Sequence, residues 1–439
     1  MTSPDTSSHK TVAFHTLGCK LNFSETSDMC RRMTNAGYVK VDFTESADIY
    51  VINTCTVTEE ANKKCRQIIS RCKRLNPNAF VVVTGCYAQL QAQKISQIEG
   101  VNLVLGGNKK TQILSIIEQC LASHESKIIL STDILHDKDF FPSYSAGDRT
   151  RSFLKVQDGC DYFCSYCTIP MARGLSRSAS IASTVQMARQ AAADGAREIV
   201  LTGVNIGDFG RHQGETLLGL IQELEGVDGV ERFRISSIEP NLLTDDIIRH
   251  CAASRKFMPH FHVPLQSGSD AMLKLMRRRY DTALYAQKVQ TIKSLIPNAF
   301  IGVDVIVGVN GETPELFEQT RSFIESIDVS QLHVFTYSER PNTKALAIKP
   351  VVPVPERHHR NAILHEISER KRIAFYQAHQ GQEAKVLIES SLRDGLHVGF
   401  TENYIRVELP ASPHEVNTIA TVRLGELTSD ALALSASRI

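Results

Sequence analysis

The chain has 439 residues, 42% of them hydrophobic, which is the composition of an ordinary folded protein with room for two or three hydrophobic cores. Its 49 Lys and Arg nearly balance its 48 Asp and Glu, so net charge argues neither for nor against a nucleic-acid partner. The polar first ten residues lack the apolar core of a secretion signal, and no run approaches the roughly 20 apolar residues of a membrane span. We therefore expect a cytoplasmic protein without a membrane partner. Eleven cysteines in such a chain favour metal or redox chemistry over a disulfide framework.

The first segment, residues 9–125, alternates apolar strands with helical stretches. This alternation predicts an α/β domain with a parallel sheet. The strands are expected at 12–14, 49–52, 80–83 and 101–105, and the helices after Ser24 and at 59–75 and 111–120. Residues 137–150 contain Pro, Gly and several Ser and Asp, and they read as a linker.

The second segment, residues 146–375, resumes the alternation. Six apolar strands are predicted, at 153–156, 199–202, 233–236, 261–264, 301–307 and 332–335. Helical stretches lie between them, for example at 181–194, 244–251 and 314–327. Six such units favour a partial (β/α)6 barrel, which keeps its chemistry in the loops at the carboxyl ends of its strands.

The third segment, residues 377–439, follows a long charged helix predicted at 356–379. Its pattern is one of short alternating strands, at 384–389, 397–400, 404–409 and 420–424. A compact small β-barrel is the structure that this pattern favours.

Three cysteines, Cys160, Cys164 and Cys167, lie within eight residues immediately after the strand at 153–156. Three soft thiolates on one loop suit an iron-sulfur cluster or zinc. A structural zinc site normally recruits a fourth protein ligand, and no fourth cysteine follows nearby. A four-iron cluster with one open iron is therefore the preferred interpretation.

A second set, Cys19, Cys55 and Cys86, is dispersed in the sequence, but each thiol follows a predicted strand by a few residues. Parallel strands direct such loops to one edge of the sheet, where ligands bind in open α/β folds. Gly18 and Gly85 leave backbone room beside two of these cysteines. The remaining cysteines lie in helical stretches and are expected to be ordinary core or surface residues, namely Cys30, Cys65, Cys72, Cys120 and Cys251.

Four motifs in order, TLGCKLN at 16–22, VINTCTV at 51–57, VTGCYAQ at 83–89 and the Cys160 loop, closely resemble the radical S-adenosylmethionine (SAM) methylthiotransferases, and more narrowly their MtaB type. The resemblance implies three domains, an N-terminal methylthiotransferase domain, a radical SAM barrel and a C-terminal TRAM domain that binds RNA. It also implies two 4Fe-4S clusters. Cys160, Cys164 and Cys167 would hold the cluster that binds SAM, and Cys19, Cys55 and Cys86 would hold an auxiliary cluster that carries the sulfur.

The implied reaction converts a C–H bond into C–S–CH3, with one SAM as methyl donor and another as radical source. For the MtaB type the target is C2 of N6-threonylcarbamoyladenosine beside the anticodon. The expected partners are the anticodon stem-loop of tRNA and an electron donor such as a flavodoxin or ferredoxin.

Other residues match the family pattern for SAM contacts. Tyr166 is expected to pack near the SAM adenine, although it could simply fill the core. Polar or small residues at strand ends are expected around SAM, although such groups are often turn or cap residues; they are Gly203, Asn205, Ser236, Glu239, Gln266, Ser267 and Asp304.

Candidate RNA contacts come from basic residues with a neighbouring aromatic ring. Arg277, Arg278 and Arg279 are followed by Tyr280, which could stack on a base, and the C-terminal barrel offers Tyr404 and Arg406. Most basic runs on helices are solvated faces, which is the competing interpretation.

Three alternatives stay open at this point. The acceptor could be isopentenyladenosine in tRNA or an aspartate of a ribosomal protein. The chain could instead be a two-cluster iron-sulfur redox protein without catalysis of its own, or a zinc-stabilised RNA-binding protein.

Overall fold

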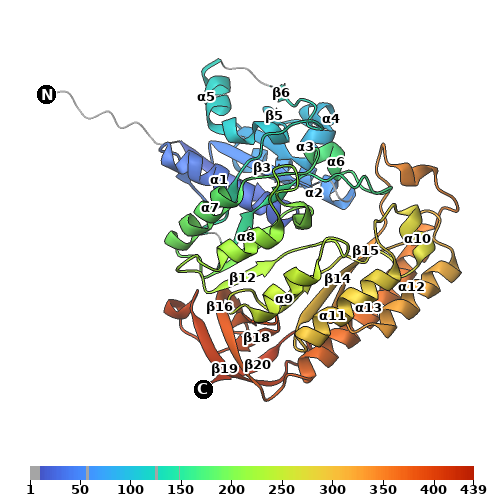
Figure 1. Ribbon diagram of the computed structural model, residues 1–439. Helices are drawn as coiled ribbons and strands as arrows, with labels where there is room; N and C mark the ends of the chain where they lie inside the picture. Colours follow the sequence, from blue (N-terminus) through green and yellow to red (C-terminus); the bar gives the residue numbers. More distant parts are fainter. Residues whose placement is uncertain (1–9, 56–58, 124–126, 148) are drawn as a thin grey trace. The chain divides into compact units, whose positions relative to one another are not determined.

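The computed structural model describes residues 10–55, 59–123, 127–147 and 149–439 (Figure 1). The chain forms two compact units. The first comprises residues 1–145, 158–161 and 168–175, and the second comprises residues 146–157, 162–167 and 176–439. The domain boundaries at 146, 375 and 377 stay predictions, and those at 9 and 125 fall outside the described residues.

The first unit contains a six-stranded parallel sheet with the order β2-β1-β3-β4-β5-β6. Its strands are β1 (Thr11–Thr16), β2 (Val39–Lys40), β3 (Ile49–Thr54), β4 (Phe80–Gly85), β5 (Leu103–Leu105) and β6 (Ile128–Leu130). Its helices are α1 (Lys20–Asn35), α2 (Glu59–Leu75), α3 (Cys86–Leu90), α4 (Ala92–Ser96), α5 (Ile113–Ser123) and, from the segment 168–175, α6 (Ile169–Arg173). A 3₁₀ turn (Gly107–Gln112) and the short strand β7 (Ser143–Tyr144) complete it.

Helices cover both faces of this sheet because successive strand residues alternate between two cores. Val51 and Val82 pack with α1 and α5 residues on one face. Ile52 and Val83 pack with residues of α2, α3 and α4 on the other. The predicted parallel α/β sheet is thus confirmed, although α1 begins at Lys20, earlier than the stretch after Ser24 predicted.

The second unit is built on six parallel strands, as predicted for a partial β/α barrel. They are β8 (Arg151–Lys155), β11 (Glu198–Thr202), β12 (Arg232–Ile235), β13 (His260–His262), β14 (Phe300–Val307) and β15 (Gln331–Thr336). β12, β11 and β8 pair in that order, and so do β13, β14 and β15. An isolated parallel bridge between Ser237 and His262 joins the two groups just after β12.

The helices of this unit begin where the sequence places capping side chains. Ser180, Thr216, Thr244, Asp281 and Thr313 each accept a hydrogen bond from a backbone N–H in the first turn of the following helix. These helices are α7 (Ile181–Ala193), α8 (Leu217–Leu224), α9 (Asp245–Ala253), α11 (Thr282–Leu295) and α12 (Pro314–Ser326), with α10 (Asp270–Leu275) between them. Short elements also occur, namely β9 (Gln157–Asp158), β10 (Arg177–Ser178) and two 3₁₀ turns (Ile206–Asp208 and Lys344–Ala347).

The C-terminal part of the second unit is a closed barrel with the strand order β16-β17-β18-β20-β19. It follows the long helix α13 (Val354–Gln377). Its strands are β16 (Glu383–Arg393), β17 (Leu396–Thr401), β18 (Arg406–Leu409), β19 (Ile419–Leu427) and β20 (Leu434–Arg438), with a 3₁₀ turn (Pro413–Glu415). The predicted small barrel is confirmed, and the unpredicted β20 closes it by pairing with both β18 and β19.

Buried arginines of β12 join this barrel to the parallel strands. Arg232 donates to the carbonyl oxygens of Phe400 and Lys385 at 3.1 and 2.8 Å. Arg234 donates to the carbonyl oxygens of Glu402 and Thr401 at 2.7 and 2.8 Å. Because the guanidinium groups are 2% and 1% exposed, these contacts form a buried junction.

The carboxylate of Glu198 balances the charge at this junction. It accepts from Arg234 Nε at 2.7 Å and pairs with Arg232 at 3.6 Å. Burial raises the pKa of Glu198, but the positive charges of Arg234 and the other nearby arginines lower it by a larger amount, so the net shift is downward. Glu198 therefore stays ionised inside the protein.

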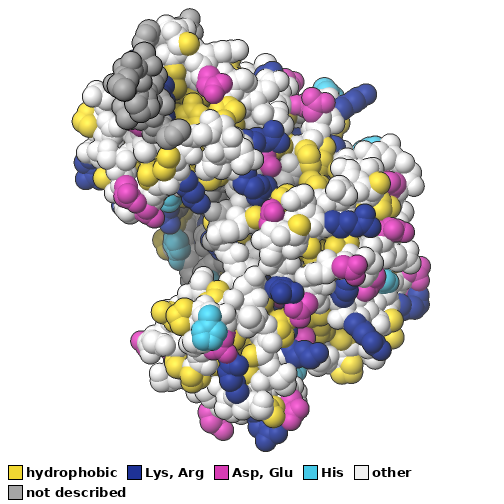
Figure 2. All heavy atoms as spheres, turned by 90° about the vertical axis from the view of Figure 1, so that its left-hand side faces the viewer, with side chains coloured by type: hydrophobic (Ala, Val, Ile, Leu, Met, Phe, Trp, Pro, Cys, Tyr) yellow, Lys and Arg dark blue, Asp and Glu magenta, His cyan; other side chains and the backbone are white. Residues whose placement is uncertain are grey.

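None of the described helices combines the length and the hydropathy needed to cross a membrane. On the face shown in Figure 2, Lys and Arg side chains are interspersed with Asp and Glu. Charges of both signs are therefore mixed on this face, in keeping with the near-zero net charge of the chain.

Candidate functional site

In the first unit, three neighbouring strands deliver three cysteines to one edge of the sheet. Cys19 follows β1, Cys55 follows β3 and Cys86 follows β4, and these strands are adjacent in the order β1-β3-β4. Thr54 pairs with Gly85 in register, so Cys55 and Cys86 continue paired positions. Adjacent strands lie about 4.8 Å apart, which brings the loops within reach of one small group.

Two glycines shape this edge. Gly18 has a φ of +103°, and a Cβ there would lie 2.7 Å from Cys55 Cβ and 3.0 Å from its Sγ. Gly85 has a φ of +97°, and a Cβ there would lie 2.4 Å from the carbonyl oxygen of Thr54. Both positions require glycine for conformation and for space, as the sequence indicated.

The three thiols range from exposed Cys19 through half-buried Cys55 to buried Cys86. Burial raises the pKa of Cys86, whereas the nearby guanidinium of Arg173 opposes that rise. Three thiols at one sheet edge, with a cation beside the buried one, fit a cubane cluster that is ligated at three of its four irons.

A buried ion network lies beside Cys86, and sequence patterns did not reveal it. Arg173 donates to Glu25 Oε1 and Asp158 Oδ1, both at 3.0 Å, and to Asn22 Oδ1 at 2.6 Å. Lys110 pairs with the other oxygen of Glu25. The four charged side chains are between 2% and 6% exposed, so two cations and two anions balance inside the first unit.

The second cysteine set lies on the loop between β9 and α6. Cys160 N–H donates to Gly174 O within the first unit, and Cys167 N–H donates to Cys164 O within the second, each at 3.1 Å. Gly159 has a φ of +70°, and a Cβ there would lie 2.0 Å from Leu175 O. Glycine is therefore required immediately before the first cysteine of the loop.

Arg278 contacts this loop, although the sequence indicated that it faces RNA. Its guanidinium donates to Cys164 Sγ at 3.1 Å, lies 3.5 Å from the Tyr166 hydroxyl and pairs with Glu239. Burial raises the pKa of Glu239, and Arg278 opposes that rise. The Arg278 side chain is only 4% exposed, so it belongs to the interior of the second unit.

Tyr280 is also interior, which corrects the expectation of a ring that stacks on RNA. It is 8% exposed, and its hydroxyl lies 2.9 Å from the carbonyl oxygens of both Pro264 and Leu265. Arg277 and Arg279 remain exposed, with the Arg279 guanidinium 4.0 Å from the centre of the Tyr162 ring. Only these two members of the basic run could meet RNA.

The candidate RNA residues of the barrel, Tyr404 and Arg406, are both half-buried. The Tyr404 ring stacks on His260 and Phe400 at 4.2 and 4.8 Å, and its hydroxyl accepts from Arg151 at 2.9 Å. The half-buried Arg406 donates its backbone N–H to the Tyr376 hydroxyl at 3.2 Å. Tyr404 thus stabilises the junction with the parallel strands and does not present a free ring.

Polar atoms without hydrogen-bond partners lie after three adjacent strands of the second unit. Among the described residues these include Asn205 Oδ1 after β11, Ser236 Oγ after β12 and Gln266 Oε1 after β13, all buried. Buried polar groups normally have partners, so this set fits a polar ligand such as SAM. Gly203 lies beside Asn205, and a Cβ there would lie 2.9 Å from Gln157 Oε1.

Ser267 and Tyr166 have protein partners. Ser267 Oγ lies 2.9 Å from Thr320 Oγ1, and half-buried Tyr166 packs against a cluster that includes Met272 and Met276. Ser267 therefore has a structural contact, while Tyr166 stays at the cysteine loop, where an adenine contact was expected.

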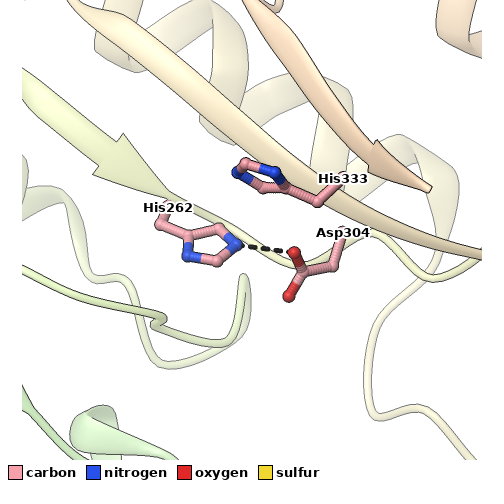
Figure 3. A group of neighbouring side chains, drawn as sticks. All are labelled: His262, Asp304 and His333. Atoms are coloured by element: carbon pink, nitrogen blue, oxygen red, sulfur yellow. Dashed lines mark hydrogen bonds and ion pairs between the residues drawn. The ribbon is translucent and has the colours of Figure 1, made fainter. Parts of the chain in front are cut away.

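Asp304, another expected SAM contact, pairs with a histidine that sequence reasoning did not single out. His262 Nε2 lies 2.8 Å from Asp304 Oδ1. His333 lies beside them, and one ligand atom from each of the three residues falls within 4.8 Å of the others (Figure 3).

The other cysteines behave as structural residues. Cys65 and Cys72 in α2 have no exposed area, and burial raises the pKa of each thiol to about 12. Both pack in the core on one face of the first sheet.

Comparison with known proteins gives this arrangement a family. A family model described as the Radical SAM superfamily matches residues 154–324, and one described as Uncharacterized protein family UPF0004 matches residues 11–106. Threonylcarbamoyladenosine tRNA methylthiotransferase MtaB of Aquifex aeolicus is 39% identical over 399 residues, which cover 90% of this chain and 96% of that protein. The chain belongs to the radical SAM methylthiotransferase family, MtaB type.

Other similar proteins include a second MtaB protein, a dimethylallyladenosine enzyme and a solved structure. The MtaB protein of Bacillus subtilis is 37% identical, covering 94% of this chain and 93% of that one. A tRNA-2-methylthio-N(6)-dimethylallyladenosine synthase of Cereibacter sphaeroides is 32% identical, covering 95% and 96%. The solved radical SAM methyltransferase TsrM of Kitasatospora setae, 15% identical, shares the fold with a TM-score of 0.58 over 77% of each chain.

Proposed function

We propose that this methylthiotransferase converts the C2–H bond of N6-threonylcarbamoyladenosine, next to the anticodon of tRNA, into C2–S–CH3. The observation that carries the proposal is the agreement among its relatives. Five proteins named as threonylcarbamoyladenosine tRNA methylthiotransferases are 33–39% identical over at least 90% of this chain. Three relatives named for dimethylallyladenosine are each 32% identical.

Each of the two cysteine sets would hold one 4Fe-4S cluster. Cys160, Cys164 and Cys167 would hold the 4Fe-4S cluster that binds SAM, because their spacing leaves one iron open. Cys19, Cys55 and Cys86 would hold the auxiliary 4Fe-4S cluster at the sheet edge. When bound, the first cluster supplies the electron that cleaves SAM, and the second supplies the sulfur that is inserted.

The protein's own residues position these groups. Arg278 holds Cys164 and Glu239 in one hydrogen-bonded set inside the second unit. The unpartnered atoms of Asn205, Ser236 and Gln266 offer SAM both donors and acceptors at the strand ends. In the first unit, burial raises the pKa of Cys86, and the positive charges of Arg173 and Lys110 oppose that rise.

The remaining partners follow from the reaction. A reduced flavodoxin or ferredoxin would supply the electron for SAM cleavage, and the enzyme would act in the cytoplasm, where tRNA is matured. The C-terminal barrel would act as a TRAM domain that binds the tRNA, and exposed Arg277 and Arg279 would add phosphate contacts.

Nucleoside mass spectrometry of total tRNA, from cells with and without this gene, tests the acceptor. The expected result is loss of 2-methylthio-threonylcarbamoyladenosine with a rise of its unthiolated precursor. An unchanged level of that nucleoside, together with loss of 2-methylthio-isopentenyladenosine, would instead assign the acceptor of the dimethylallyladenosine relatives. If neither tRNA nucleoside changes, the ribosomal aspartate becomes the acceptor to examine.

Purified variants test the division between the cysteine sets. Cys164→Ala should abolish reductive cleavage of SAM to 5′-deoxyadenosine, because it removes a ligand of the SAM-binding cluster. Cys55→Ala should retain some cleavage but form no methylthio product. Cys30→Ala is the matched control, since Cys30 is a buried cysteine of α1 outside both sets, and it should retain both activities.

Three outcomes of this experiment would contradict the proposal or part of it. Equal loss of both activities in folded Cys55→Ala protein would contradict the division of labour. A wild-type protein that binds two clusters but never cleaves SAM would be a redox protein, and bound zinc without iron or sulfide would indicate a zinc-stabilised RNA-binding protein.

A further inference from the structure

Three polar side chains from adjacent strands lie together on one face of the sheet β13-β14-β15. His262 ends β13, Asp304 lies in β14 and His333 lies in β15, opposite Asp304 in the strand register. Figure 3 shows the three side chains directed toward one another. The His262 and His333 rings are 5.3 Å apart between centroids at an angle of 65°.

This cluster is open to solvent. The side chains of His262 and Asp304 are 20% and 21% exposed, and His333 is exposed, whereas the preceding Leu332 is buried. Phe335, two residues after His333 and therefore on the same face, is 46% exposed. A large apolar ring and three polar groups thus share an accessible strand face.

A glycine keeps space in front of the cluster. Gly302 precedes Asp304 by two residues, so the two positions share a face of β14. A Cβ at Gly302 would lie 3.7 Å from His333 Nε2, so any longer side chain there would meet the imidazole. The absence of a side chain at Gly302 leaves the His333 ring approachable.

The cluster lies close to the strand ends already assigned to SAM. Ser237, which follows Ser236, bridges to His262, and the backbone N–H of Gln266 donates to Asp304 O at 2.8 Å. Backbone contacts therefore join the cluster to the segments that carry Ser236 and Gln266, which is where an acceptor would have to lie for a reaction that starts with SAM.

We propose that His262, Asp304 and His333 form the binding site for the threonylcarbamoyl group of the acceptor nucleoside. This inference rests on the proposed function. The group carries a carboxylate, a hydroxyl and a ureido N–H. Imidazole N–H groups donate to the carboxylate, while the Asp304 carboxylate accepts from His262 and from the hydroxyl or ureido N–H.

The same chemistry explains selection against an apolar acceptor. A dimethylallyl group offers no hydrogen bond, so its binding would desolvate three polar side chains without replacing their contacts with water. Phe335 lies on the same face at a position where it can stack on the adenine ring. The site thus recognises the threonylcarbamoyl group by polar contacts and binds the adenine ring by stacking.

The test compares anticodon stem-loop RNAs that carry threonylcarbamoyladenosine, its methyl ester or plain adenosine. Binding to the holoenzyme is measured by fluorescence anisotropy, and initial rates are measured for methylthio transfer and for 5′-deoxyadenosine formation without RNA. The variants are His333→Ala, His333→Asn, which keeps an N–H donor, and the control His358→Ala on the exposed side of α13.

Esterification should weaken wild-type binding by about 10- to 100-fold, the range expected for hydrogen bonds to a charged group. His333→Ala should bind the natural acceptor about as weakly as the wild type binds the ester, and esterification should affect it little. His333→Asn should recover part of the affinity. Cleavage of SAM without RNA should stay within about two-fold in all variants, because the proposal places His333 at the acceptor and not at SAM.

Three results would overturn the inference. Equal wild-type affinity for the acid and the ester would show that the carboxylate is not recognised. Loss of RNA-free SAM cleavage in His333→Ala would assign the cluster to SAM. Zinc or cobalt bound by the wild type at one per chain, and lost in His333→Ala, would identify a metal site. Absence of methylthio transfer by the wild type is a separate result, which would contradict the proposed function itself.

Discussion

Arg173 is the centre of the buried ion network in the first unit, and replacing it with Met tests how much that network stabilises the fold. The substitution removes the hydrogen bonds to Glu25, Asp158 and Asn22, at 3.0, 3.0 and 2.6 Å. Glu25 keeps Lys110 as its partner, whereas Asp158, 5% exposed, loses its ion pair with Arg173. Because breaking one partner of a buried pair leaves an uncompensated charge, we expect a loss of about 3–5 kcal/mol in unfolding free energy.

The assay is urea unfolding, with hydrogen exchange of peptides from β3 and β4 to localise the loss to the first unit. Arg249→Met is the matched control, since Arg249 pairs with Asp246 on the surface with both side chains more than 60% exposed. The control should change stability by less than about 0.5 kcal/mol. A cost below about 1 kcal/mol for Arg173→Met, or a cost equal to that of the control, would refute the reasoning.

Two further predictions concern the sheet edge and the barrel junction. Gly18→Ala should lower iron and sulfide content, because its Cβ would collide with Cys55, whereas Gly195→Ala, at a similar φ of +93° with open space around it, should not. Glu198→Gln should cost about 3–5 kcal/mol in urea unfolding at neutral pH, against little for exposed Glu231→Gln. Burial raises the pKa of Glu198, but the arginines lower it by more, so the pKa in the folded protein is below the ordinary glutamate value. The ionised Glu198 therefore stabilises the fold fully at pH values above the ordinary glutamate pKa of about 4.3. It is lost as the pH falls through the lower folded value, so the difference between wild type and Glu198→Gln should shrink on acidification. A constant difference between pH 7 and 3 would contradict this sign.

The six barrel strands could be predicted from the sequence because each is a short apolar run between clear helix signals. Thr244, for example, caps α9 at the start of the helical stretch predicted at 244–251. The strand β20 was missed, since its alternation is short and its stability comes from pairing with β18 and β19, which are distant in sequence. Long-range pairing is the information that a local pattern lacks.

The same limit applies to the site. The cysteines were predictable because thiols after parallel strands must meet at one sheet edge. The cluster of His262, Asp304 and His333 was not, because strand periodicity gives the face of a residue but not its cross-strand neighbour. Tyr280 was misjudged for a related reason. An aromatic ring after three arginines is typical of an RNA contact, yet the chain turns inward after α10 and buries the ring under the β13 loop.

The strand β12 carries both the barrel junction and one of the strand-end polar groups. Arg232 and Arg234 donate hydrogen bonds to the barrel backbone. Ser236 follows Arg234 by two residues, or about 7 Å along an extended chain. The barrel therefore cannot move relative to the parallel strands without displacing β12, the strand that Ser236 follows. The barrel and the end of β12 are thus held at a fixed separation, so that anything bound to the barrel keeps one distance from Ser236.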